Sequence, residues 1–248
     1  MIVSLDLHVH TAASRDGSMP LDEIIRRAKA RGLQGIAVTD HDVFSENLPQ
    51  TDDFLLIPGC EFSTKYGHLL GLFLTEPISP NKTFYQLAEA IHAQGGIAVL
   101  AHPFEHKTDA GRIDPIAYLL DGVEIRNGRA TRKNPAANDQ AEAWAEQYWL
   151  PGTCGSDAHV PQEIGRVYRQ YEVPALTLEA VRDAILDPYA AREMVFRPGK
   201  RRWVAKSQLA KLRQSRAGLK NYLKWCAFAA KCCLEDLLER SISLRKKR

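Results

Sequence analysis

Histidines and carboxylates recur in short clusters along the first 160 residues of the sequence, and these side chains can bind divalent metal ions. Because alternate residues of a strand point to the same side, His8 and His10 can bind one cation together. Asp157 and His159 repeat this spacing in an extended segment. Glu61 has two carboxylate oxygens and can bridge two metals. Imidazole and carboxylate ligands without a thiolate favour Zn, Mn or Fe over soft metals.

Each cluster adjoins a short apolar run that we predict to be a strand. The carboxyl ends of strands in a closed parallel barrel lie on one face, so six of the eight histidines are expected to meet there. Burying so many ionisable groups without a metal would be costly. The predicted metal ligands are His8, His10, Asp16, His41, Glu61, His68, His102, Asp157 and His159.

The elements that must position these residues alternate between strands and helices, which indicates parallel βα units. The apolar runs are continuous, as is typical of strands covered on both faces. Strands are predicted at 2–9, 35–39, 54–57, 68–73, 97–100, 123–125 and 150–154. Helices are predicted at 21–31, 84–94, 113–120, 136–148 and 178–186.

Composition indicates a globular protein of one large or two small domains. The chain has 248 residues, of which 45% are hydrophobic and 25% charged. No apolar run reaches the length of a membrane-spanning helix, and no signal peptide is predicted at the N-terminus. Five cysteines without framework spacing favour reduced thiols and a cytoplasmic location.

The C-terminal segment differs from the rest of the chain in charge. Residues 197–248 contain 16 Lys and Arg against 3 Asp and Glu, whereas residues 1–196 are acidic overall. We therefore predict a body at 1–196 and a basic helical extension at 197–248. The extension can contact a polyanion or an anionic membrane surface. Its apolar stripe is expected to pack on the barrel or on a second copy; the stripe comprises Leu219, Leu223, Cys226, Ala230, Cys233 and Leu237.

The ordered motifs resemble those of the polymerase and histidinol phosphatase (PHP) domain family. They are DLHVHT at 6–11, SRDG at 14–17, TDHD at 39–42, GCEFST at 59–64, AHP at 101–103 and GSDAH at 155–159. The resemblance covers about residues 3–170. It implies an α/β fold, a distorted (β/α)7 TIM-like barrel that holds two or three divalent metal ions.

The resemblance also implies a ligand set. His8, His10, Glu61 and Asp157 would hold the first metal, and Asp16, His41 and His159 the second. Glu61 would bridge, while His68 and His102 would serve a third metal or the phosphate. Many histidinol phosphatases of the family have His where this chain has Asp16, which favours the nucleotide or oligonucleotide phosphoesterase branch.

Further residues near these motifs are candidates for supporting roles. The stretch at 124–129 resembles the E-x-x-N-x-R segment of small PHP phosphoesterases, and Arg129 can bind phosphate or form an ion pair. Asp40 or Asp42 is expected to orient a ligand imidazole. Asp157 and His159 can assist proton transfer.

The leading hypothesis is therefore a metal-dependent phosphoesterase that acts on a nucleotide, a short oligonucleotide or RNA, or another small phosphate. Two metals about 3.5–4 Å apart can stabilise the attacking and leaving oxygens. An amidohydrolase-type hydrolase is an alternative, although such enzymes usually carry a bridging lysine. A non-catalytic barrel that binds metal or nucleic acid is another.

Overall fold

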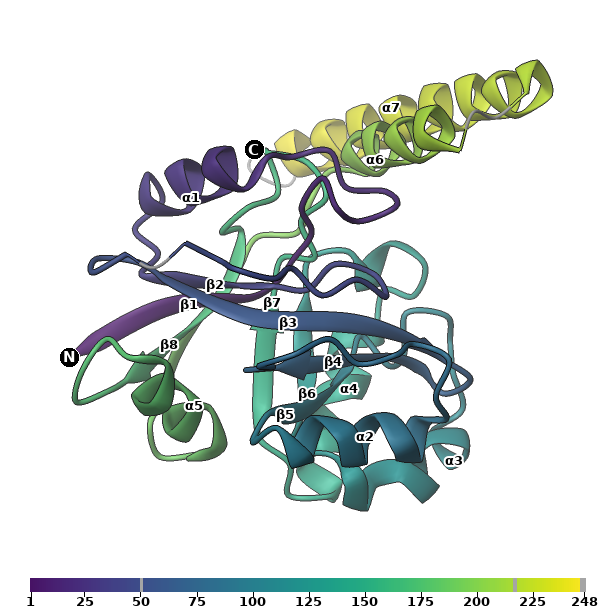
Figure 1. Ribbon diagram of the computed structural model, residues 1–248. Coiled ribbons are helices and arrows are strands. Elements are labelled where there is room, and N and C mark those ends of the chain that lie inside the picture. Colours follow the sequence, from purple (N-terminus) through teal and green to yellow (C-terminus); the bar gives the residue numbers. More distant parts are fainter. Residues whose placement is uncertain (50, 216–217, 246–248) are drawn as a thin grey trace.

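The computed structural model describes residues 1–49, 51–215 and 218–245, and Figure 1 shows a strongly curved sheet with two long helices across one end. The strands are β1 (Ile2–Val9), β2 (Gly35–Val38), β3 (Leu55–Thr64), β4 (Gly67–Leu72), β5 (Ile97–Ala101), β6 (Gly122–Asn127), β7 (Gly152–Gly155), β8 (Val167–Glu172) and β9 (Ala191–Phe196). The helices are α1 (Leu21–Lys29), α2 (Phe84–Ala93), α3 (Ala110–Ile113), α4 (Ala137–Gln147), α5 (Leu178–Leu186), α6 (Arg201–Gln214) and α7 (Leu219–Arg245), with short 3₁₀ turns η1 (Asp114–Leu119) and η2 (Ala130–Arg132).

Strands β1 to β7 form a nearly closed barrel. The sheet order is β7-β6-β5-β4-β3-β2-β1-β8-β9. The ring closes where the segment after β7 meets β1: His10 N donates to Ala158 O at 2.9 Å, and Asp157 N donates to His8 O at 2.9 Å. This architecture confirms the predicted α/β, TIM-like barrel.

The expectation of uniformly parallel strands is wrong at β4. This strand runs antiparallel to both β3 and β5. No helix separates it from β3, because Lys65 and Tyr66 form a tight turn and Gly67 has φ 118°, a conformation that favours glycine. Since β4 runs in the opposite direction, its first residues lie where the other barrel strands end. His68 thereby reaches the same rim although it opens a strand.

Local sequence accounts for most of the elements. Helix α2 begins with a capping box, in which the side chain of Thr83 accepts from Gln86 N and that of Gln86 accepts from Thr83 N. Leu87 and Ile91 on its inner face are fully buried against the sheet. The predicted strand at 54–57 extends to Thr64, and strands β8 and β9 were not predicted. The two missed strands pair antiparallel beside β1, outside the ring.

The cysteines separate into buried and exposed thiols. Cys60, Cys154 and Cys232 are buried, whereas Cys226 and Cys233 are exposed. Burial raises the pKa of Cys154 to about 12 and also raises the pKa of Cys60. The predicted inertness of Cys60 and Cys154 is consistent with this burial.

We expect two thiols to react rapidly in the native protein and all five after unfolding, because thiolate formation and access both limit the reaction. Titration with a chromogenic disulfide reagent, with and without denaturant, measures both counts. A native count of four or five would contradict the burial of Cys60 and Cys154.

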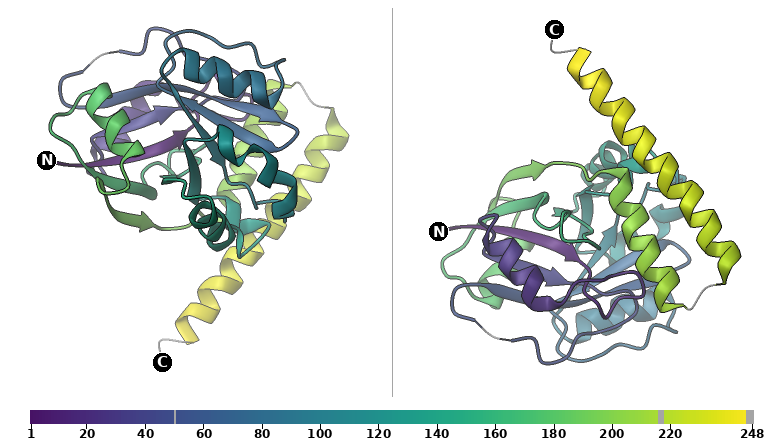
Figure 2. Two further views of the ribbon diagram at one scale, coloured as in Figure 1. Left: turned by 90° about the horizontal axis from the view of Figure 1, so that it is seen from below. Right: turned by 90° about the horizontal axis from the view of Figure 1, so that it is seen from above.

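Helices α6 and α7 lie side by side across the barrel mouth, as all three views show (Figure 2). Trp225 Nε1 of α7 donates to Ala205 O of α6 at 2.7 Å. Asp236 accepts from the backbone N of Arg201 and Arg202, at 2.8 and 3.3 Å, and so caps the start of α6. These contacts fix which face of α7 points toward the body.

The prediction that the apolar stripe packs on the barrel is wrong. All six residues of that stripe, from Leu219 to Leu237, are exposed. The face of α7 that turns inward instead carries Tyr222, Trp225 and Cys232. The stripe faces solvent because the contacts of Trp225 and Asp236 with α6 turn a different face of α7 toward the barrel. Packing on a second copy, and contact with a polyanion or membrane surface, stay predictions.

The boundary predicted between 196 and 197 falls between β9 and α6. Part of the predicted extension, residues 216–217 and 246–248, lies outside the described residues. Among the residues that are described, no helix is both long and apolar enough to cross a membrane.

Candidate metal centre

All nine predicted metal ligands meet at the barrel rim beneath α6 and α7. His8 and His10 stand at the end of β1, both fully buried, as the alternation of a strand requires. Glu61 lies on β3, and Asp157 and His159 follow β7. The remaining four residues come from four further segments: Asp16 from the loop after β1, His41 from the loop after β2, His68 from β4 and His102 from the residue after β5.

Glu61 occupies the centre of the cluster. One carboxylate oxygen, Oε1, lies 2.7 Å from His68 Nδ1 and 3.1 Å from His102 Nε2. The other, Oε2, lies 2.9 Å from His41 Nδ1, 3.4 Å from His8 Nε2 and 3.3 Å from His10 Nε2. One buried carboxylate therefore contacts five imidazoles, which is the arrangement expected of a group that bridges two sites.

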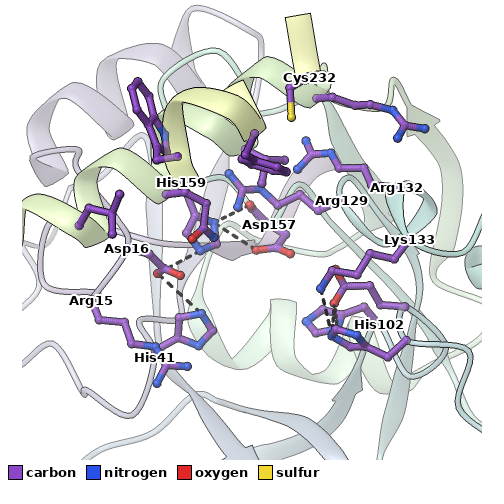
Figure 3. Close-up of a pocket in the computed structure, with 18 of the residues that line it drawn as sticks. Arg15, Asp16, His41, His102, Arg129, Arg132, Lys133, Asp157, His159 and Cys232 are labelled. Carbon is purple, nitrogen blue, oxygen red and sulfur yellow. Dashed lines mark hydrogen bonds and ion pairs between the residues drawn. The ribbon is translucent and has the colours of Figure 1, made fainter. Parts of the chain in front are cut away.

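A second set of contacts surrounds Asp16. Its Oδ1 lies 3.2 Å from His159 Nε2 and 3.7 Å from His41 Nε2. Asp157 Oδ1 lies 3.3 Å from His159 Nδ1 and 3.4 Å from His10 Nε2. His159 is thus a shared neighbour of the two carboxylates. Figure 3 shows Asp16, His41, Asp157 and His159 facing one another.

The donor set fits divalent metal ions. Four groups of potential ligands have their ligating atoms within 4.8 Å of one another: His10, Asp16, His41 and His159; His8, His102 and Glu124; His8, His10 and Asp157; and His41, Glu61 and His68. Glu61 Oε2, His41 Nδ1 and His68 Nδ1 are buried without a hydrogen-bond partner in the described part of the chain. The near neighbours of these atoms are other potential ligands, and buried polar atoms without a hydrogen bond are costly, so they suit coordination of a cation.

The electrostatics of the centre follow from burial and close opposite charges. Burial raises the pKa of Glu61, but the imidazoles of His68, His8 and His41 hold it well below its usual range. Burial lowers the pKa of His102, but its hydrogen bond to Glu61 and that carboxylate's charge raise it to about 9. Carboxylates that stay ionised are ready to bind metal.

Glu124 is a residue of the centre that the predicted ligand set lacked. Its Oε1 lies 3.0 Å from His8 Nδ1, and its Oε2 accepts from His102 N at 3.0 Å and Asn127 Nδ2 at 2.9 Å. The contact to Nδ1 sets the tautomer that leaves His8 Nε2 facing Glu61. Its place on β6 was the available signal, since every other barrel strand contributes to this rim.

The prediction that Asp40 or Asp42 orients a ligand imidazole is wrong. Asp40 accepts from Thr11 N and Thr11 Oγ1, both at 2.7 Å. Asp42 accepts from Ser63 N and Ser63 Oγ, both at 2.9 Å. Both carboxylates shape loops beside the rim because nearer backbone donors bind them.

Two rim residues adopt left-handed backbone conformations. His102 has φ 30° and Asp157 has φ 54°. Side chains with a Cβ rarely adopt this region, so surrounding contacts must hold it. The bonds of His102 N to Glu124 and of Asp157 N to His8 O supply those contacts.

Arg129 is buried and forms a two-point ion pair with Glu163. Its Nε and Nη2 donate to Glu163 Oε1 and Oε2 at 3.1 and 2.7 Å. Glu163 also accepts from Arg132 Nη2 at 2.9 Å and from His159 N at 3.0 Å. Arg129 therefore supports the rim, while its predicted contact with substrate phosphate stays a prediction.

We expect Glu163→Gln to lower the free energy of unfolding by about 3–5 kcal/mol, because two guanidiniums would lose their buried counter-ion. Denaturant unfolding measures the loss. Glu172→Gln is the matched control: its ion pair with Arg192 is exposed, so its loss should cost less than about 1 kcal/mol. Equal losses in the two variants would contradict this reading of Glu163.

The candidate metal ligands form the floor of a cavity of about 680 Å³ between the barrel and the C-terminal helices. Cationic side chains line its walls: Arg15, Arg129, Arg132, Lys133, Arg201, Lys224 and Lys231. A volume in this range suits a small-molecule ligand. The fold and the site together define a TIM-like barrel with a candidate metal centre under a basic, roofed cavity.

The comparisons with known proteins agree with this class. A family model described as PHP-associated matches residues 135–187. An uncharacterized protein of Methanocaldococcus jannaschii is 32% identical over 137 residues, which cover 49% of this chain and 80% of that protein. Another from the same organism is 28% identical over 176 residues, covering 68% of this chain and 70% of the relative.

A solved structure from Bacteroides vulgatus shares the fold. It is a two-domain protein containing a predicted PHP-like metal-dependent phosphoesterase, with a TM-score of 0.58 and 19% identity, covering 85% of this chain and 70% of that one. The chain belongs to the PHP domain family.

Proposed function

We propose that this protein is a metal-dependent phosphoesterase. The observation that carries the proposal is the carboxylate of Glu61, buried among five imidazoles at the rim and flanked by Asp16 and Asp157. Two or three divalent ions, of Mn, Zn or Fe, would be held by the nine residues that the sequence predicts. The relative from Bacteroides vulgatus, described as phosphoesterase-like, supports the same chemistry.

Bound divalent ions would supply charge neutralisation for the phosphoryl oxygens and a more acidic water. The chain's own residues do the rest. The cationic walls attract the phosphate, and Arg132 and Lys133 stand on the side opposite Asp16 and His41 in Figure 3. In the hydrolysis, a water oxygen bonds to phosphorus, the ester P–O bond breaks and the released alcohol takes a proton.

His159 is placed to handle that proton. Its Nε2 faces Asp16 at 3.2 Å and its Nδ1 lies 2.9 Å from the backbone O of Asp157. The two contacts hold the imidazole between the carboxylates at the cavity floor. We propose that Asp157 and His159 position a water molecule and pass its proton toward the leaving oxygen.

The substrate class that the cavity supports is a small phosphate ester: a nucleotide, a short oligonucleotide end or another phosphorylated metabolite. The volume of about 680 Å³ favours a small substrate, and the surrounding cations favour a negatively charged one. An amidohydrolase-type reaction is the alternative. The central bridging position here is occupied by Glu61 and not by the lysine usual in that class, which favours phosphate esters.

The test is hydrolysis of a panel of phosphomonoesters, cyclic nucleotides and short RNAs, with added Mn and after chelation; release of inorganic phosphate reports on the monoesters, and chromatography of the products reports on the cyclic nucleotides and RNAs. We expect turnover that chelation abolishes and Mn restores. His10→Gln should abolish it, whereas His92→Gln should not, because His92 pairs with Asp121 away from the rim. Metal binding without turnover of any ester would favour a non-catalytic barrel, and turnover that survives chelation would overturn the proposal.

A further inference from the structure

The roof of the cavity differs chemically from its floor and walls. Helices α6 and α7 line it with apolar and aromatic groups beside polar and charged ones, whereas the floor is imidazole and carboxylate. The apolar roof residues that line the cavity are Val204, Leu212, Trp225, Phe228 and Cys232. Phe228 is 41% exposed, which is unusual for a ring that lines a cavity already covered by its own chain.

Polar contacts hold α6, and with it the roof, in a fixed position on the barrel. Arg129 Nη2 donates to Ser207 Oγ at 3.3 Å, and Ser207 is fully buried. Gln214 Nε2 donates to Gly17 O at 3.2 Å at the other end of α6. The aromatic residues of α7 are in turn held on α6 through Trp225 Nε1 and Ala205 O.

The hydrogen bond between Trp225 Nε1 and Ala205 O determines which interactions Trp225 can make with a ligand. An indole has one hydrogen-bond donor, and Ala205 O already accepts from it. The remaining surface of the ring is carbon, as is that of Phe228. Lys224 and Lys231 flank these rings on the same helix and carry charge toward the cavity.

The cavity therefore has a candidate metal centre as its floor, cationic side chains on its walls, and aromatic rings on the opposite side. A ligand that satisfies both has a phosphate at one end and a planar aromatic group at the other. A purely aliphatic or sugar phosphate would leave the rings of Trp225 and Phe228 in contact with water. Stacking on aromatic side chains contributes about 1–3 kcal/mol for each base.

We propose that the α6–α7 roof is the subsite for the leaving group of the substrate, and that this leaving group carries a planar aromatic ring system such as a nucleobase. The inference rests on the proposed phosphoesterase function and narrows it. Trp225 and Phe228 set specificity for the leaving group, whereas the metal centre acts on the phosphate.

The experiment compares adenosine 5′-phosphate with glycerol 3-phosphate, since both are phosphates of primary alcohols and only the first carries an aromatic group. We expect Phe228→Leu to raise KM for adenosine 5′-phosphate about tenfold while leaving kcat/KM for glycerol 3-phosphate unchanged. Trp225→Phe keeps a ring but loses the bond to Ala205, and should have a smaller effect than Trp225→Leu. Leu223→Ala is the control, because that side chain is 62% exposed on the outer face of α7.

A second measurement separates the subsite from catalysis. Calorimetric binding of adenosine, which has no phosphate, to the full-length protein should weaken in Phe228→Leu and not in Leu223→Ala. Hydrolysis of no substrate in the panel, together with adenosine binding that depends on Phe228, would overturn the phosphoesterase proposal and with it the leaving-group role, and would leave Trp225 and Phe228 as a binding site for an aromatic ring. Hydrolysis of both esters with equal responses to Phe228→Leu would overturn the subsite alone. Adenosine binding unchanged in Phe228→Leu and Trp225→Leu would also overturn it.

Discussion

Glu61→Gln is expected to reduce phosphoesterase activity on the order of a thousandfold, corresponding to about 4 kcal/mol of transition-state stabilisation. The amide has nearly the same shape but loses the negative charge that five imidazoles surround. It would also place an NH₂ group against ring nitrogens at 2.7–3.4 Å. Both changes disfavour a cation, so the metal content should fall with the activity.

The measurement pairs kcat/KM on the best ester of the panel with elemental analysis of the purified variant. Glu142→Gln is a matched control, because that carboxylate binds Arg126 outside the rim and should leave both quantities unchanged. A Glu61→Gln protein that is folded, fully metal-loaded and active within tenfold would show that Glu61 is not a ligand.

Removal of bound metal is expected to destabilise the protein in a pH-dependent way. In the metal-free protein Glu61 raises the pKa of His102 to about 9, above its ordinary value of 6.5. A raised histidine pKa adds stability that is complete below pH 6.5 and is lost as the pH rises to about 9. At about 1.4 kcal/mol for each pKa unit, the loss reaches about 3 kcal/mol.

The metal-loaded protein should not lose this stability, because a ligating imidazole is already deprotonated. Thermal unfolding of chelated and Mn-loaded samples from pH 6 to 9 measures the difference. The gap between their Tm values should widen with pH. His102→Asn should reduce the pH trend of the chelated sample, and His8 and His41, whose pKa values nearby carboxylates also raise, should maintain the rest. Parallel Tm curves for the two samples would contradict the assignment to His102.

Much of the centre could be predicted from the sequence because its geometry is local. The i, i+2 spacing of His8 and His10 survives in any strand. The extended segment predicted at Asp157 and His159 is wrong, since Asp157 has φ 54°, yet both side chains still reach the rim. The barrel then has to bring strand ends together, so nine scattered residues meet without further information. What the sequence could not supply is which carboxylate supports which imidazole.

The errors share one physical cause, competition between partners that are distant in sequence. Asp40 lies beside His41 in the chain, yet the donors of Thr11 bind it, while Glu124 contacts His8 although the two are 116 residues apart in the sequence. The stripe that begins at Leu219 has helical spacing, yet the hydrogen bond of Trp225 turns a different face inward. Periodicity predicts a helix but not its rotation against a neighbour.

The left-handed conformations of His102 and Asp157 have a consequence for engineering. Glycine adopts these dihedral angles without penalty, so Asp157→Gly would relieve steric strain while deleting a carboxylate. A library screened only for heat resistance would therefore enrich variants that have discarded the reactive rim. Directed evolution of this scaffold requires simultaneous selection for turnover.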